Sequence, residues 1–106
     1  MRRAVEHFNA TAETRKVAGL IRSLGDPRVA VLADGAGRVL VTVAWELSWY
    51  QWEIGGDGDG GVREVRKGNE VSELGEGERT WNARAGTDGT LRLEAAAAPT
   101  AQANAG

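Results

Sequence analysis

The chain has 106 residues, with 15 glycines, no cysteine, one histidine and a formal net charge of −2. This length supports one small domain and no second independent core. The lack of cysteine excludes disulfide frameworks and thiolate-built zinc sites, and a single histidine excludes His-rich metal clusters. Thirteen basic residues against 15 acidic ones create no strong field toward a nucleic-acid backbone or an anionic membrane.

The first 24 residues predict an arm followed by one helix. Residues 1–10 show no clean hydrophobic period, so we expect a flexible arm there. Residues 11–24 predict a helix, because apolar residues recur at i, i+3, i+4 and i+7. Gly25 then supplies a C-terminal cap, and Pro27 stands where the helix cannot resume. The helical stripe consists of Val17, Leu20, Ile21 and Leu24.

The rest of the chain predicts β structure with glycine-rich turns. The expected strands are 28–33, 38–54, 62–67, 80–84 and 90–94, with 62–67 polar enough to lie near a sheet edge. Residues 68–79 are predicted to be irregular, with Val71 and Leu74 holding them to the core. Residues 95–106 carry no large side chain to bury, which predicts a disordered tail. The expected fold is a single α+β domain over 11–94, with one N-terminal helix packed on an antiparallel sheet of about five strands.

The run 39–54 holds most of the aromatic residues, and its apolar face changes sides within the run. Side chains alternate between the two faces of a strand. Odd-numbered positions are apolar up to Trp49, whereas even-numbered positions are apolar from Tyr50 onward. The inversion therefore falls between these two residues.

Two interpretations explain the inversion. A β-bulge near Ser48 to Tyr50 resets the register and places every apolar side chain in one core. Alternatively, a regular strand leaves Tyr50, Trp52 and Ile54 as a separate patch on the far face, where they would bind a partner or ligand. The run exceeds the usual strand length, which favours the bulge. Burial of Trp52 in the same core as Val41 would exclude the patch.

The glycine loop 55–61 predicts an antiparallel hairpin between the end of this run and residues 62–67. Ordinary sheet stabilisation explains the cross-strand pairs that result, without any functional site. The expected pairs are Glu53 with Arg63, Ile54 with Val62, and Tyr50 with Arg66.

Candidate catalytic chemistry is sparse. Glu46 is the most interesting carboxylate, because a carboxylate flanked by aromatic residues can act as a general acid. No second carboxylate stands at a defined position, so an ion pair with an arginine of a neighbouring strand is the simpler arrangement. His7 has no nearby residue to orient it, and Asp57 and Asp59 lack the further ligands of a calcium loop. We predict no catalytic residue, no metal site and no cofactor.

Three functions fit these residues. The first is a non-enzymatic protein-interaction module that forms a homodimer, or binds another protein, through a sheet edge or the aromatic patch. The second is a small-ligand or single-stranded nucleic-acid binder that uses the face of Trp49, Tyr50 and Trp52, with Arg66 and Glu46 beside it. The third is an enzyme that uses Glu46 with an arginine. Acidic residues interleave the aromatic ones, which disfavours nucleic acid, and the first function is our expectation.

The predicted cellular setting follows from what the sequence lacks. No apolar run approaches the roughly 20 residues of a membrane span. The opening residues MRRAVEH do not resemble the apolar core of a signal peptide. We therefore expect a cytoplasmic protein that does not enter membranes.

Overall fold

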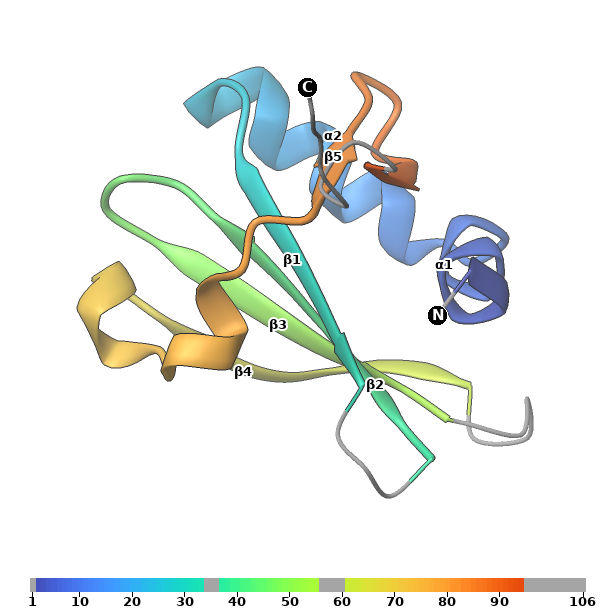
Figure 1. Cartoon of the computed structure of the whole chain (residues 1–106). Coiled ribbons are helices and arrows are strands. Elements are labelled where there is room, and N and C mark those ends of the chain that lie inside the picture. The colour runs from blue at the N-terminus through green and yellow to red at the C-terminus, as the bar shows by residue number, and fades with distance from the viewer. Residues whose placement is uncertain (1, 34–36, 56–60, 95–106) are drawn as a thin grey trace, which may run out of the picture.

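Two helices pack on one face of an antiparallel sheet in the computed structural model, which describes residues 2–33, 37–55 and 61–94 (Figure 1). The sheet order is β4-β3-β2-β1-β5-β6. The α+β class and the antiparallel sheet are confirmed, with six strands in place of about five. The elements are α1 (Arg2–Asn9), α2 (Glu13–Leu24), β1 (Arg28–Ala33), β2 (Val39–Ala44), β3 (Trp49–Ile54), β4 (Val62–Gly68), β5 (Ala83–Ala85) and β6 (Leu91–Leu93).

Helix α2 confirms the predicted helix. Val17 and Ile21 from its apolar stripe are buried against the sheet, whereas Leu24, at its last position, is exposed. Gly25 ends the helix with a φ of 93°, a conformation that glycine adopts without steric cost. Its N–H donates to the Ile21 carbonyl at 2.8 Å.

Helix α1 replaces the flexible arm that was expected for residues 1–10. Val5 and Phe8 are buried, and the Phe8 ring meets Trp52 edge-on, with 5.6 Å between ring centroids. Two buried apolar residues in eight make too short a pattern to reveal a helical period. An isolated helix of this length is unstable in water, so packing on the sheet stabilises it. The fold therefore has two helices, not one.

The run 39–54 is a hairpin of two strands, not one long strand. The chain turns between Trp45 and Ser48, where the Trp45 N–H donates to the Ser48 carbonyl at 2.7 Å. β2 and β3 then pair with Val41 opposite Trp52. Trp52 is fully buried in the cluster that contains Val41 and Trp45. The far-face patch is therefore wrong, and the inversion reflects a turn, not the bulge expected near Ser48.

The sheet is covered on both faces. The helix side buries the larger core, which includes the valines of β1 and β2. On the other face Trp49 packs with Ala44 and Leu74. Leu74 belongs to the crossing from β4 to β5, which contains two 3-10 turns, η1 (Val71–Glu73) and η2 (Glu76–Arg79). Val71 and Leu74 hold this segment to the sheet as expected.

A β-bulge does occur, but in the outer strand β4. Gln51 pairs with Arg66 and Trp52 pairs with Glu64, so the intervening Val65 has no partner in β3. The bulge shifts the pairing of Tyr50, which faces Lys67 instead of Arg66. The other two expected pairs, Glu53 with Arg63 and Ile54 with Val62, are confirmed.

Some expectations concern residues outside the described ranges. Residues 56–60, with the two aspartates of the candidate calcium loop, and the predicted tail 95–106 lie outside the described residues. Of the helices that are described, none has the length and apolar character needed to cross a membrane.

Candidate functional site

The aromatic residues predicted to form one binding face do not share a face. Trp49 and Trp52 lie on opposite sides of the sheet in separate clusters, with 3% and 0% of their surfaces exposed. Tyr50 is half-buried on the helix side, and the Lys16 ammonium lies 4.9 Å from its ring centroid. A surface on which bases stack requires exposed rings, and the rings of Trp49 and Trp52 are covered.

Arg66 does lie beside Trp49, but it belongs to a polar network that fastens η2 to the sheet. Its guanidinium is 5.2 Å from the Trp49 ring centroid and donates to a Glu78 carboxylate oxygen at 3.2 Å. The buried Gln51 amide donates to the same Glu78 at 2.9 Å and to Thr42 at 3.0 Å. We interpret Arg66 as a residue that stabilises the crossing segment.

The charges in this crossing segment are set by hydrogen bonds. Partial burial raises the pKa of Glu78, but bonds from the Gly75 N–H, Gln51 and Arg66 outweigh it and bring the pKa below its ordinary value. The pKa of Glu73 is also lowered, first by the Glu70 N–H and then by the Trp49 indole. Both carboxylates are therefore held ionised as structural acceptors.

Glu46 lies in the exposed turn between β2 and β3, not in mid-strand. Among the described residues it has no hydrogen bond and no ion pair, so the predicted contact with an arginine is not formed there. The pockets at the β1–β5 gap, beside α1 and beside Lys67 are lined by other residues. Glu46 therefore lines none of these three pockets.

The two edges of the sheet are protected differently. At β6, helix α1 covers the strand and Asn9 closes it. The Asn9 side chain accepts a hydrogen bond from the Leu91 N–H at 2.7 Å and donates one to the Leu91 carbonyl at 2.9 Å. This side chain replaces one residue of a neighbouring strand, and it leaves β6 little free backbone for pairing.

Strand β4 is the open edge, as its polar sequence predicted. It is seven residues long and lies at the outside of the sheet. Arg63 has 72% of its side chain exposed, and Val65 at the bulge is an exposed apolar residue. Lys16 of α2 forms an ion pair with Glu64 at one face of the strand. Residues 62–68, which carry three cationic side chains and one carboxylate, form the candidate site, which we call the β4 edge.

The described residues provide no group of three or more histidine, aspartate and glutamate side chains that could hold a metal ion. The polar composition of residues 62–67 predicted the β4 edge, but no feature of the sequence predicted the role of Asn9. A lone asparagine carries no local pattern that shows which strand it will cover, because the contact spans 82 positions.

The fold and this edge define the class of the protein: an α+β domain with helices on one face of a six-stranded antiparallel sheet and one outer strand, β4, to which no other described strand is paired on its outer side. In comparisons with protein-family models, curated proteins and solved structures, none matches this chain.

Proposed function

We propose that this chain is a non-enzymatic protein-interaction module that binds an extended, acidic segment of a partner protein along the β4 edge. The observation that carries the proposal is the difference between the two edges: β6 is short, covered by α1 and closed by Asn9, whereas β4 is long and open. An added strand satisfies the outward backbone groups of β4 and gains main-chain hydrogen bonds.

Charge favours an acidic partner over a second copy of the chain. Pairing two β4 strands antiparallel about Val65 places Arg63 of one copy opposite Lys67 of the other. Glu64 then faces Arg66, but each strand still carries three cations against one carboxylate, so two copies bring together strands of the same net charge. Like charges directly opposite in a sheet are destabilising, whereas opposite charges contribute roughly 0.2–1 kcal/mol per pair. The bulge and the charged side chains also discourage unselective pairing, so they give the edge specificity. The homodimer that the sequence suggested is therefore the less favoured form of this function.

Titration with model peptides, followed by amide NMR, tests this function. The probe is an extended peptide of about eight alternating valines and glutamates, and its control replaces every glutamate with lysine. We expect shifts concentrated in residues 62–68, weakened by salt, and no comparable response to the lysine peptide. Equal binding of both peptides, or shifts away from β4, would contradict the proposal.

Variants and alternative partners sharpen the test. Replacing Arg63 and Lys67 together with glutamate should reverse the charge preference, whereas Arg92→Glu on β6 should leave it unchanged. Light scattering should show a monomer; a stable dimer joined through β4 would mean that the partner is a second copy. Tighter binding of a thymidine oligonucleotide than of the acidic peptide would instead indicate a nucleic-acid binder.

A further inference from the structure

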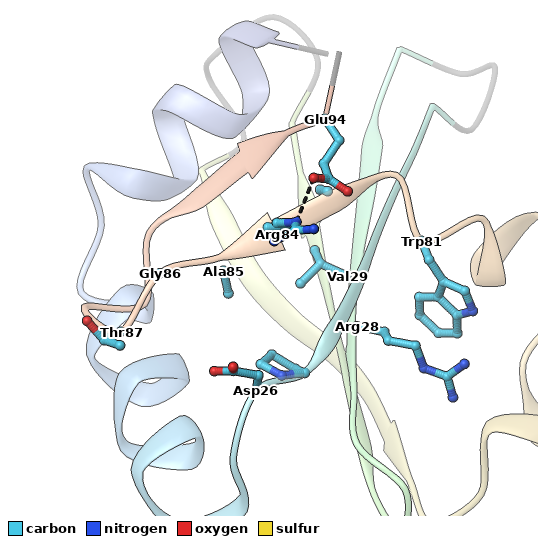
Figure 2. Close-up of a pocket in the computed structure, with 11 residues that line it drawn as sticks. Asp26, Arg28, Val29, Trp81, Arg84, Ala85, Gly86, Thr87 and Glu94 are labelled. Atoms are coloured by element: carbon cyan, nitrogen blue, oxygen red, sulfur yellow. Dashed lines mark ion pairs between the residues drawn. The ribbon is translucent and has the colours of Figure 1, made fainter. Parts of the chain in front are cut away.

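A pocket opens where β1 and β5 separate (Figure 2). These strands share a single residue pair, Val29 opposite Ala83. Continuing the same register places Pro27 opposite Ala85, and proline has no N–H to contribute to a ladder. The strands part at this point and leave a pocket of about 470 Å³, within the size range of small-molecule sites.

The backbone of Ala85 faces this gap without a partner. The Asn82 carbonyl accepts a hydrogen bond from the Glu94 N–H, so the backbone groups of Asn82 point toward β6. Backbone groups alternate in direction along an antiparallel strand, so those of Ala85 point toward β1. Pro27 has no donor to offer there, and none of the described backbone hydrogen bonds outside the regular ladders uses Ala85. The pocket wall therefore carries an N–H and a carbonyl of Ala85 that have no hydrogen-bond partner among residues 2–33, 37–55 and 61–94.

Two opposite charges line the pocket and have no ion-pair partner among the described residues. The Arg28 guanidinium lies 4.8 Å from the centroid of the Trp81 ring, which holds the side chain and leaves its N–H donors available. Figure 2 shows Arg28 and Trp81 at one side of the pocket and Asp26 at the other. The other two charges neutralise each other in an ion pair between Arg84 and Glu94, at 2.6 Å.

Trp81, which lines the pocket, has a strained backbone conformation. Its φ of 47° is the one positive value among the described non-glycine residues. A bulky residue rarely adopts this left-handed conformation, and such strain clusters at ligand sites. The next residue, Asn82, is tied through its side chain to both backbone groups of Val31. That attachment holds Trp81 in place against the pocket.

We propose that this pocket binds a short peptide with free termini. The peptide's carboxylate pairs with Arg28, its ammonium pairs with Asp26, and one of its peptide units completes the hydrogen bonds of Ala85. A simple anion would face the carboxylate of Asp26, and a simple cation would face Arg28. A ligand with both charges satisfies both residues. The site is independent of the β4 edge, because β2 and β3 lie between β4 and β1 in the sheet.

Amide and indole NMR of the whole chain tests the site with trialanine as the probe. We expect shifts at Ala85, Gly86 and the Trp81 indole at concentrations up to about 10 mM, the range for weak ligands. The matched probes are N-acetyl-trialanine, trialanine amide and inorganic phosphate. Each blocked peptide should bind about tenfold more weakly, because each lacks one charged partner.

Two variants test which residue binds each terminus of the peptide. Arg28→Gln should make trialanine and its amide bind equally, and Asp26→Asn should make trialanine and its acetylated form bind equally. Arg92→Gln, outside the pocket, is the control. The proposal is overturned if trialanine gives no shift at Ala85 and Trp81, if blocking either end has no effect, or if phosphate binds as well as trialanine, which would indicate a plain anion site.

Discussion

The side-chain amide of Asn82 binds both backbone groups of Val31, accepting from its N–H at 2.7 Å and donating to its carbonyl at 3.0 Å. β5 pairs with β1 at Val29 alone, so without Asn82 this part of β1 would have no neighbour on its β5 side. Asn9 makes the same pair of bonds to Leu91 at the outer edge of the sheet. Two asparagines thus replace missing strand residues, and the sheet stays continuous where its ladders end.

We predict that Asn82→Ala lowers the free energy of unfolding by about 2–4 kcal/mol, because it leaves two backbone groups of the buried Val31 unsatisfied at about 1–3 kcal/mol each. Asn82→Asp should cost nearly as much, since a carboxylate oxygen then faces the Val31 carbonyl. Urea denaturation followed by tryptophan fluorescence measures both. Asn69→Ala, which removes an exposed amide, is the control; equal stability of the Asn82→Ala and control variants would contradict this role.

Gly89 allows the β5–β6 turn to pack directly on helix α2. Its φ is 84°, and a Cβ placed there would lie 1.9 Å from the Thr14 carbonyl oxygen and 2.9 Å from the Ala18 nitrogen. Both contacts are with helix backbone, which cannot rotate away. We predict that Gly89→Ala lowers the free energy of unfolding by about 3 kcal/mol or more.

Gly19→Ala is the matched control for this prediction. Gly19 lies inside α2, and a Cβ there meets nothing within 4 Å. Alanine in a helix interior should stabilise the protein by about 0.5–1 kcal/mol relative to glycine. Thermal unfolding followed by circular dichroism distinguishes the two changes, which are expected to have opposite signs. A tolerated Gly89→Ala would show that the turn does not pack as closely on α2.

Stability should fall in acid because of Glu78. Its carboxylate accepts bonds from the Gly75 N–H, Gln51 and Arg66, so its pKa lies below the ordinary value of 4.5 in the folded chain. A carboxyl with a depressed pKa contributes stability above its unfolded pKa, and this contribution is lost as the pH falls through the folded pKa. The decrease therefore begins near pH 4.5 and continues below it.

Urea denaturation between about pH 7 and pH 3 measures this effect. Glu78→Gln should be less stable than the wild-type chain at neutral pH, and the difference between the two should shrink in acid. Glu76→Gln removes an exposed carboxyl of the same 3-10 turn that has no bond to any described residue, and it should keep the wild-type pH profile. A difference for Glu78→Gln that stays constant with pH would argue against an ionised structural carboxylate.

The sequence predicted those parts of the fold that are specified by a pattern within a short stretch of residues. The stripe of α2 and its Gly25 cap, the polar edge strand β4 and the anchoring Leu74 all carry their own pattern. The turn at Glu46 and Leu47 carries no such local pattern. Neither residue has a positive φ, so the turn needs no glycine or asparagine, and the sequence there looks like continuous strand.

The sites depend on contacts between distant segments, which a single sequence does not display. Arg28 and Trp81 meet only because β5 returns to β1 after the crossing over the other face of the sheet. Asn82 reaches Val31 across 51 positions. The aromatic residues were easier to notice than these contacts, yet Trp49 and Trp52 proved to be core. The antiparallel hairpin pairs odd positions of β2 with even positions of β3, so Trp52 shares the helix face with Val41. Trp49 lies on the opposite face, where Leu74 covers it.

Trp52 therefore supports the fold, not a binding surface. Its ring contacts Phe8 of α1, and its indole N–H donates to Glu13 of α2 at 2.7 Å, so one side chain joins both helices to the sheet. We predict that Trp52→Ala lowers the free energy of unfolding by about 3–5 kcal/mol, the usual range for a buried tryptophan. Leu47→Ala, at an apolar residue with 77% of its surface exposed, should change it by less than about 0.5 kcal/mol. Chemical denaturation gives both values. Removal of a side chain that packs between both helices and the sheet must lower stability. If Trp52→Ala instead kept the stability of the wild-type chain and lost only an interaction with a partner, Trp52 would belong to a binding surface and not to the core.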